Sequence, residues 1–583
     1  MPGTEPQRSR RHVAAGQWRT FPFATALRGT LREGYSGRKL RADIVSGVIV
    51  GIVALPLAMA LAIASGVPPQ HGLYTAIVAG GLIAVTGGSR LNVSGPTAAF
   101  VVLLAPISAQ YGLGGLALAS LMAGAILVVM GLARLGKLVQ FVPYPVTTGF
   151  TAGIAVVIAT LQVKDFLGLN VTPSGDHYWN RIADLASAMP SVSWADALVG
   201  GVTLALLLVW PRITRKIPGP LVAIALAAGL AYALSEFAGV QPATIAGRFS
   251  YVKDGVTMPG IPQLPPLPVL PWSLPGPDGQ PLHMDWALVR ALIGPAFAIA
   301  ALGAIESLLS AVVADGMAGT RHDPDAELVG QGLGNLVAPF FAGFAATGAI
   351  ARTATNVRNG GRSPIAALTH ALFLLAVVMA LAPVLGYLPM AGLAALLLVV
   401  AWNMSDAKHF VHMLRVAPRS DLVVLLLCFA LTVVFDMVIA VSVGIVLAAL
   451  LFMRRMAEIS GARVVGNGAA AREPLPQGVM LYEIAGPLFF GAADKAISAI
   501  QTTGSEKVLV LDMHAVPAMD VTGLVALESL LGKLRSQGVR VCMVGVCPQP
   551  RRAMAKAHIE EAPGELSFHP TLEAALATER KAN

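Results

Sequence analysis

Apolar residues dominate the chain almost without a break from Ile44 to Met453. Their runs are separated by short polar stretches or by stretches rich in glycine and proline, and several runs are too short to cross a hydrocarbon core of about 30 Å as a helix. The pattern predicts a polytopic α-helical membrane protein with fourteen segments, at 44–64, 70–87, 97–109, 113–132, 147–163, 194–210, 219–238, 286–313, 327–343, 347–358, 364–384, 389–402, 420–435 and 437–453.

Two of these segments, 97–109 and 347–358, are the shortest, and each follows a stretch rich in Gly, Pro or Thr. We interpret both as half-helices that are preceded by extended backbone. The proline-rich loop 239–285 divides the fourteen segments into two sets of seven, and the short segment is third in each set. Interrupted segments at corresponding positions indicate inverted repeats with a binding site near the middle of the membrane.

The composition changes after Arg455. Val508–Asp512 and Val539–Gly545 have the pattern of buried parallel strands, and Val521–Gln537 between them has helical spacing. This predicts a soluble α/β domain. The expected domains are a basic N-terminus at 1–42, a membrane domain at 43–455 (repeats at about 43–238 and 286–455, divided by loop 239–285), a linker at 456–475 and the soluble domain at 476–581.

Composition excludes an ordinary soluble protein. Charged residues make up 13% of the chain and hydrophobic residues 55%, whereas soluble domains carry about 25% charged residues. The three cysteines, at 428, 542 and 547, do not form a disulfide framework or a zinc site. We therefore expect no metal and no cofactor, and no nucleophile–base pair points to an enzyme.

The net charge of +9 is concentrated near the membrane segments. Residues 1–42 hold nine Lys and Arg against two Glu, immediately before the first segment. This is the positive-inside pattern. It predicts a multi-pass protein of a bacterial-type inner membrane with both termini in the cytoplasm, and it argues against nucleic-acid binding.

Several long motifs in order resemble the sulfate permease (SulP/SLC26) family of anion transporters. The tail resembles a STAS domain. The resemblance implies two inverted seven-helix repeats, a core and a gate domain, a homodimer, and transport of small anions such as sulfate, bicarbonate, chloride or dicarboxylates. The motifs are Asp43–Gly47, Leu55–Tyr74, Asn92–Thr97 and Ala346–Arg362 in the membrane region, and Val508–Asp512 and Met519–Leu524 in the tail.

The two half-helices are the expected substrate site. A helix N-terminus leaves N–H groups unpaired and carries a partial positive charge, so two such ends that face each other bind an anion without a fixed cation. The alternative is that these small residues only pack helices closely. The substrate-binding residues that we predict are Ala58 and Leu61 of the first segment, Gly95, Thr97 and Ala98 at the third, and Thr347, Gly348, Ala349, Ile350 and Arg352 at the tenth.

Two charged residues lie within apolar segments. Arg352 matches a basic position beside the anion site of relatives and adds positive potential, although it could instead snorkel or pair structurally. Glu306 is a carboxylate inside the eighth segment that can take up and release a proton. We predict that it couples anion transport to protons; the alternative is a permanent Glu306–Arg352 ion pair. Sodium-coupled relatives carry Thr where this chain has Ser310 and Ile350, which favours protons over sodium.

Thr522 is a candidate regulatory residue, because related bacterial regulators carry a phosphorylatable Ser there. The plainer interpretation is that Asp520 and Thr522 cap a helix. For the whole chain we predict proton-coupled symport of a small anion by alternating access, with sulfate first. Bicarbonate or C4-dicarboxylate symport, anion exchange, a passive channel, a STAS-linked membrane sensor and a nucleobase permease remain the alternatives.

Overall fold

The computed structural model describes most of the 583 residues. Residues 1–21 of the expected N-terminus, and residues 460 and 465–474 of the expected linker, lie outside the described part. The chain forms two compact units, Met1–Ile445 and Val446–Asn583. The described residues are 22–137, 142–172, 174, 178–214, 217–253, 255–435, 437–459, 461–464, 475–489, 493, 497, 500 and 507–582.

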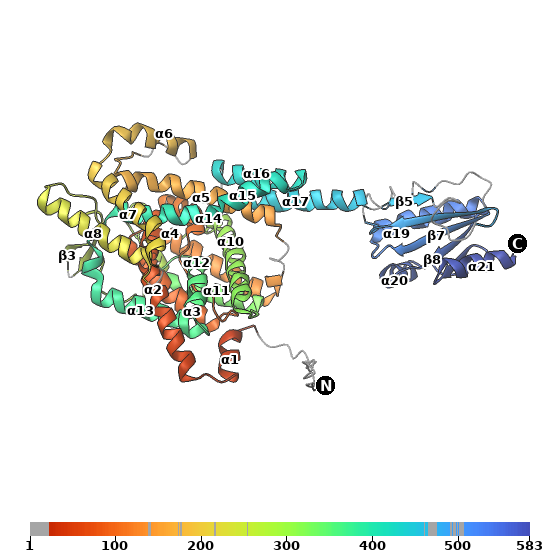
Figure 1. Cartoon of the computed structure of the whole chain (residues 1–583), viewed down its shortest axis with the longest axis horizontal. Coiled ribbons are helices and arrows are strands. Elements are labelled where there is room, and N and C mark those ends of the chain that lie inside the picture. The colour runs from red at the N-terminus through yellow and green to blue at the C-terminus, as the bar shows by residue number, and fades with distance from the viewer. Residues whose placement is uncertain are drawn as a thin grey trace, which may run out of the picture. The chain divides into compact units, whose positions relative to one another are not determined.

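The first unit is built mainly of helices (Figure 1), and every expected membrane segment coincides with one. A helix begins within each of the two shortest segments, at residue 98 in segment 97–109 and at residue 350 in segment 347–358. The helices are α2 (Gly37–Ala64), α3 (Pro69–Thr86), α4 (Ala98–Leu132), α5 (Tyr144–Leu167), α7 (Trp194–Ile213), α8 (Gly219–Phe237), α10 (Trp286–Ala318), α11 (Pro324–Val337), α12 (Ile350–Arg358), α13 (Pro364–Leu385), α14 (Met390–Ser405), α16 (Arg419–Val434) and α17 (Met437–Ile459).

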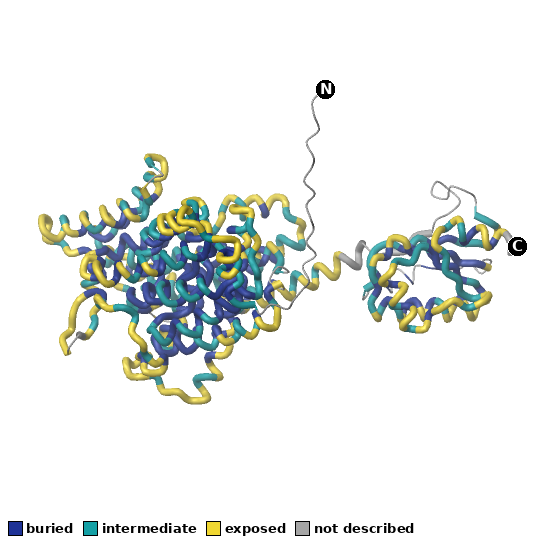
Figure 2. The backbone as a smooth tube through the Cα atoms, turned by 90° about the horizontal axis from the view of Figure 1, so that it is seen from below, coloured by how far each residue is buried: buried dark blue, intermediate teal, exposed yellow. Residues whose placement is uncertain are grey.

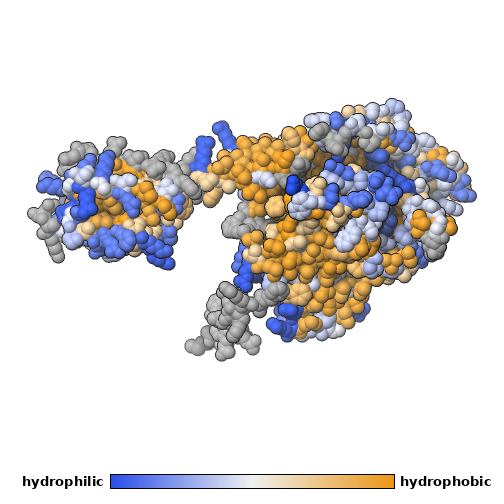
Figure 3. Space-filling view, turned by 180° about the vertical axis from the view of Figure 1, so that it is seen from behind, coloured by the Kyte–Doolittle hydropathy of each residue, from blue (hydrophilic) through white to orange (hydrophobic). Residues whose placement is uncertain are grey.

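The chain is a multi-pass membrane protein. Eight helical stretches of the described chain are long and apolar enough to cross a bilayer, and the face of the first unit drawn in Figure 3 has a broad hydrophobic area. By contrast, α12 has nine residues and spans only about 14 Å, as expected of a half-helix. Fourteen crossings stay a prediction. The eight stretches are Gly37–Ala64, Ala98–Leu132, Tyr144–Leu167, Trp194–Ile213, Gly219–Phe237, Trp286–Ala318, Pro364–Leu385 and Met390–Val416.

The helices pack in two groups. In one, α4 lies against α10 and α11, and α13 lies against α2 and α3. In the other, α5 lies against α14 and α16, and α7 lies against α8 and α14. The buried residues of this unit are concentrated in its interior, and the exposed residues lie around them (Figure 2). The two groups match the core and gate domains that the family resemblance implied.

Helix α4 contains two expected segments, 97–109 and 113–132, joined at Gly112. This residue has φ 65° and ψ −170°, which interrupts the helix. Loop 239–285 passes very close to Gly112. A Cβ on Gly112 would lie 2.4 Å from the carbonyl carbon of Gly276 in that loop. The loop is also tied to the helix by the Gly114 N–H, which donates to the Pro275 carbonyl at 3.0 Å.

The loops between the membrane helices contain more structure than the sequence predicted. Loop 239–285 is mostly non-helical, as its prolines indicated, but it also forms a hairpin and short helical turns. A helix, α6, lies in the loop before α7. These additional elements are α1 (Thr25–Arg32), α6 (Tyr178–Ala188), α9 (Ile245–Arg248), α15 (Ala407–Val416), the hairpin β2 (Ser250–Lys253) and β3 (Val256–Pro259), and 3₁₀ turns at Met189–Ser191, Pro271–Ser273 and Ala338–Phe341.

The second unit contains a five-stranded sheet of order β5–β6–β7–β8–β9, in which β6 to β9 run parallel and β5 antiparallel. The two expected strands and the helix between them are present as β7, β8 and α19. Apolar side chains cover both faces of the sheet. The elements are β5 (Gly461–Val464), β6 (Val479–Ala485), β7 (Val508–Ala515), α19 (Val521–Ser536), β8 (Arg540–Val544), α20 (Pro548–Lys556), β9 (Leu566–His569) and α21 (Leu572–Ala582).

Replacing Gly112 by alanine should destabilise the membrane unit. The new side chain would meet the strain of a positive φ and the backbone of the crossing loop, at a cost of at least about 2 kcal/mol. We expect a lower melting temperature of the detergent-solubilised protein, measured by fluorescence-detected size exclusion after heating. Gly229→Ala is the control, because it lies in α8 with open space around its Cα; equal melting temperatures for both variants would contradict this prediction.

Candidate functional site

A two-residue ladder lies at the centre of the site. Strand β1 (Ser94–Gly95) pairs antiparallel with β4 (Thr347–Gly348). Each strand leads almost directly into a helix, β1 into α4 and β4 into α12. Because the strands are antiparallel, the two helices leave the ladder in opposite directions and both place their N-termini beside it.

Neither of the two helices has a side-chain cap among the described residues. Thr97 is the N-cap of α4 and Ala349 the N-cap of α12, and neither side chain accepts a capping hydrogen bond from its helix. The Ala349 N–H itself donates to the Val93 carbonyl at 2.9 Å. Two helix N-termini with uncapped N–H groups, close together inside a membrane protein, favour negative charge.

Side chains from α10 complete the surroundings of the ladder. The Thr97 hydroxyl donates to Glu306 Oε2 at 3.0 Å, and the Thr347 hydroxyl donates to the Gly303 carbonyl at 2.9 Å. Glu306 is only 9% exposed. The structure therefore brings Gly95 and Thr97 together with Glu306 and Thr347, which lie more than 200 residues later in the chain.

Arg352 lies in the first turn of α12 and is 1% exposed. One terminal nitrogen donates to the Pro96 carbonyl at 2.9 Å, whereas Nε and the other terminal nitrogen have no hydrogen-bond partner among the described residues. Gly95 makes room for this side chain, since a Cβ there would lie 2.4 Å from Arg352 Nη1. A buried guanidinium with unused donors beside two helix N-termini is suited to hold an anion.

The alternative of a permanent Glu306–Arg352 ion pair is not what the structure has. In the part of the chain that is described, Glu306 bonds to Thr97 and Arg352 to Pro96, and no ion pair joins the two charges. The two partners, Thr97 and Pro96, are neighbouring residues at the start of α4, and each charge bonds to one of them.

The remaining predicted residues differ in exposure. Ala98 is nearly buried, while Ile350 at the start of α12 is 43% exposed. Ala58 and Leu61 are buried in α2, and the Ala58 carbonyl packs against Gly72 of α3. A direct role of Ala58 and Leu61 in lining the site stays a prediction.

Sequence reasoning missed Glu327, which organises the polar core beside the ladder. It is 1% exposed. Its Oε2 accepts from the backbone N–H groups of Gly88 and Ser89 at 3.0 and 2.9 Å. Its Oε1 accepts from Asn92 Nδ2 at 2.7 Å and from the Ser307 hydroxyl at 3.0 Å. This carboxylate therefore fixes the loop that leads into β1.

Asn92 extends the network from Glu327 to the other half-helix. Its Oδ1 accepts from the Ser310 hydroxyl at 2.7 Å and from the Thr353 hydroxyl at 2.9 Å. Thr353 also accepts from the Val93 N–H at 2.9 Å. Helices α10, α11 and α12 are thus joined through one amide side chain.

A pattern in the sequence could have revealed this network. Glu327, Gln331 and Asn335 recur at every fourth position, which places them on one face of α11. All three are buried. Gln331 Nε2 donates to the Ser94 hydroxyl of β1 at 2.8 Å, and Asn335 exchanges hydrogen bonds with the Ala346 backbone just before β4. A polar stripe on an otherwise small and apolar helix was the available signal.

In the second unit, the predicted regulatory residue Thr522 lies in the first turn of α19 and is partly buried. Asp520 is the N-cap, and its side chain accepts from the Gly523 N–H at 2.9 Å. The cap is therefore made by Asp520. A regulatory role for Thr522 stays a prediction.

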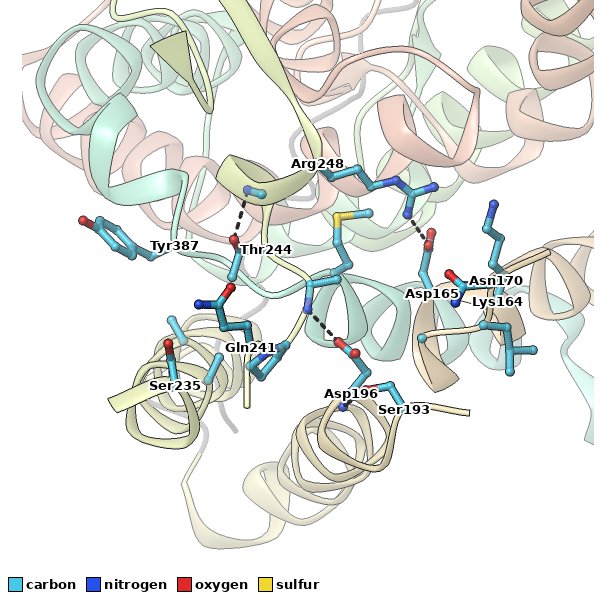
Figure 4. A pocket seen from close by; sticks show the side chains of 18 of the residues that line it. Lys164, Asp165, Asn170, Ser193, Asp196, Ser235, Gln241, Thr244, Arg248 and Tyr387 are labelled. Carbon is cyan, nitrogen blue, oxygen red and sulfur yellow. Dashed lines mark hydrogen bonds and ion pairs between the residues drawn. The ribbon is translucent and has the colours of Figure 1, made fainter. Parts of the chain in front are cut away.

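A cavity of about 1010 Å³ lies away from the ladder, among α5, α7, α8 and the segment around α9 (Figure 4). Its polar groups bond to one another: Arg248 pairs with Asp165, and Asp196 accepts from the Ala243 N–H at 3.0 Å. None of the predicted site residues lines it. Within the described residues, no cluster of three or more His, Cys, Asp or Glu side chains could hold a metal ion.

The family model of the sulfate permease family matches residues 40–428, and that of the STAS domain matches residues 473–575. The chain belongs to the sulfate permease family. The resemblance seen in the sequence motifs is confirmed. The family consists of membrane transporters, so this chain is a transporter and not an enzyme.

Curated relatives are similar in sequence to this chain over nearly its whole length. The putative sulfate transporter YvdB of Bacillus subtilis (strain 168) is 38% identical over 538 residues, which cover 92% of this chain and 97% of the relative. The bicarbonate transporter BicA of a Picosynechococcus species is 29% identical and covers 89% of this chain and 91% of its own length.

Solved structures share the fold. The murine Slc26a9 anion transporter in the inward-facing state superposes with a TM-score of 0.83 at 19% identity, covering 99% of this chain and 97% of that one. The transmembrane domain of a cyanobacterial BicA superposes with a TM-score of 0.59 at 27% identity, covering 71% of this chain and 98% of that domain. These matches confirm the fold class, a polytopic helical domain with a C-terminal STAS domain.

Replacing Glu327 by glutamine should destabilise the site. The amide would present an NH₂ group to N–H and O–H donors that now share a carboxylate, leaving at least one buried donor unsatisfied at a cost of about 1–3 kcal/mol. We expect a lower melting temperature of the purified protein than for wild type. Glu236→Gln, an exposed residue near the end of α8, is the control. A melting temperature unchanged in Glu327→Gln would show that the network does not need the charge.

Proposed function

We propose that this protein is a secondary transporter that moves a small anion across the membrane by alternating access, with sulfate as the first substrate to test. Membership of the sulfate permease family and relatives named as sulfate or bicarbonate transporters support anion transport. The observation that carries the proposal is the meeting of two uncapped helix N-termini beside the buried guanidinium of Arg352.

The proposed site has positive potential without an exposed cation. The N–H groups of the first turns of α4 and α12 supply hydrogen-bond donors, and the unused nitrogens of Arg352 supply charge. Thr97 offers a hydroxyl, and Ile350 is accessible at 43% exposure. We propose that the anion binds among Gly95, Thr97, Ala98, Thr347, Gly348, Ala349, Ile350 and Arg352, with Ala58 and Leu61 at the edge.

We propose that Glu306 carries the coupling proton. Its carboxylate bonds to the N-cap residue of α4, so its charge lies beside the proposed anion. A negative carboxylate there repels an anion, and protonation removes this repulsion. Proton uptake would therefore favour anion binding, and the two would cross together as symport.

The surroundings of Glu306 support protons over sodium. Ile350 offers no side-chain oxygen, and the hydroxyl of Ser310 is engaged with Asn92 and Thr353. Sodium prefers several oxygen ligands, as other hard cations do.

The second candidate for the transported anion is bicarbonate, which the similarity to BicA over most of the chain favours.

We infer the orientation in the membrane from the charge pattern and the homodimer from the family. We propose that both termini are cytoplasmic, that the membrane domain spans about 43–455 and the STAS domain about 476–581, and that the protein is a homodimer in an inner membrane. The basic residues before the first segment support this orientation.

The test of function is uptake into proteoliposomes that contain the full chain under an inward proton gradient. Labelled sulfate, bicarbonate and fumarate are compared in parallel. Accumulation of one anion above its equilibrium level establishes proton-driven transport and identifies the substrate. Equilibration without accumulation would instead indicate a channel or an exchanger.

Glu306→Gln should abolish proton-driven accumulation and leave anion binding partly intact. The amide is neutral at every pH and keeps an oxygen that can accept from Thr97. We expect accumulation to fall to the equilibrium level, while binding of the labelled anion to the purified variant stays within about tenfold of wild type. Glu236→Gln again serves as control. Uptake by Glu306→Gln that still follows pH would exclude Glu306 as the coupling residue.

A further inference from the structure

The N-terminal helix α1 is bonded to the loop that leads into the site. The Ala24 N–H donates to the Thr86 carbonyl at 2.7 Å. Just after α1, Glu33 forms a two-point ion pair with Arg90, whose guanidinium holds the pKa of Glu33 below its usual value. Helix α1 is therefore bonded at its start to the last residue of α3 and just after its end to the loop between α3 and β1.

The same loop carries this contact to the ladder. Four residues lie between Arg90 and Gly95, and they include Asn92, which bonds to Glu327 and Thr353. A shift of α1 would therefore move a segment that ends at the N-terminus of α4. Closely bonded backbone of this kind transmits small displacements instead of absorbing them.

The side chains on the outer face of α1 form no ion pair in the described chain, and the Arg28 guanidinium lies over the Phe23 ring, 5.5 Å from its centre. Ala26 and Thr30 are buried on the inner face, whereas Arg28, Leu31 and Arg32 are exposed on the other. Leu31 is 58% exposed. An exposed leucine between two arginines on one helix face is the pattern of a helix that lies in the headgroup region of a bilayer.

The start of α2 extends this basic face. Arg38, Lys39 and Arg41 lie in its first turns. The helix has 28 residues and is about 42 Å long, which exceeds a hydrocarbon core of about 30 Å. Ile44 and Val45 lie shortly after these basic residues and are exposed. Their apolar side chains are suited to contact the acyl chains of the lipids. The first turns of α2 therefore belong at headgroup depth, beside α1.

Nearby acidic groups do not neutralise these charges. Between residues 22 and 45 the only acids are Glu33 and Asp43. Glu33 pairs with Arg90, and the buried Asp43 accepts from the backbone N–H of Arg362 at 2.5 Å and from Tyr35 at 2.6 Å. In Figure 3, hydrophilic residues gather below the hydrophobic surface at the end of the unit where α1 lies.

We propose that α1 and the first turns of α2 form a docking surface for anionic phospholipid headgroups, and that this contact regulates transport through the Glu33–Arg90 pair. The surface consists of Arg28, Leu31, Arg32, Arg38, Lys39 and Arg41. Its occupant is the bilayer itself, because the basic face continues directly into side chains that face the acyl region. The regulatory part rests on the transport function proposed above.

The test compares the full chain in vesicles of phosphatidylcholine with vesicles that also contain phosphatidylglycerol. Two quantities are measured: the phosphatidylglycerol retained by the purified protein in native mass spectrometry, and the rate of anion uptake. The double variant Arg28→Gln/Arg32→Gln removes charge from the surface. Glu33→Gln leaves the surface intact and breaks the link to the loop. Arg290→Gln, an exposed arginine in the first turns of α10, is the control.

We expect phosphatidylglycerol to raise the uptake rate of wild type and of Arg290→Gln. The double variant should retain less lipid, by about fivefold for each arginine lost, and should lose the rate increase. Glu33→Gln should retain lipid like wild type but lose the rate increase.

Three results would overturn the proposal. Equal retention of phosphatidylglycerol by wild type and the double variant would exclude the docking surface. A rate increase that Glu33→Gln keeps would exclude the route through Arg90. A rate increase reproduced by soluble glycerol phosphate would exclude the bilayer as the source. If no vesicle shows uptake of any anion, the proposed function fails, and lipid retention still decides the docking surface.

Discussion

Backbone polar groups inside a membrane must find partners within the protein, and this constraint governs the centre of the structure. The chain is extended at Ser94–Gly95 and at Thr347–Gly348, where no helix satisfies its hydrogen bonds. The two stretches pair with each other, and buried side chains from α11 and α12 accept from backbone N–H groups of the flanking segments. This arrangement allows two helices to begin in mid-protein with N-termini still open.

The polar network around the ladder explains why the site is rigid on one side and open on the other. Glu327 accepts from the backbone N–H groups of Gly88 and Ser89 and from Asn92, and Gln331 donates to the Ser94 hydroxyl, so the loop before β1 is fixed. Arg352, by contrast, keeps two nitrogens that have no hydrogen-bond partner among the described residues. A fixed frame with a few unused donors is what a reversible binding site requires, because donors that bond to the protein are not available to a ligand.

The periodicity of the sequence predicted most helices to within a few residues, because apolar runs bounded by glycine and proline leave few alternatives. It also located the half-helices, since the short runs at 97–109 and 347–358 stand out by length and position. It also separated 97–109 from 113–132, between which Gly112 interrupts the helix. It did not predict the helix α6 or the β2–β3 hairpin in the loops, nor the close approach of Gly276 to Gly112, which depends on a segment far away in the chain.

The sequence by itself determined the class of the protein, its membrane helices, its STAS domain and most of the proposed site, because these depend on composition, periodicity and local motifs. Only the tertiary structure decided what the charged residues contact. In the structure, Glu306 bonds to Thr97 and not to Arg352. Glu327 lies at the centre of the polar core, and the Glu33–Arg90 ion pair joins α1 to the loop before β1. These contacts join residues that are far apart in the chain. The spacing of residues along a single sequence does not indicate which distant residues will lie in contact.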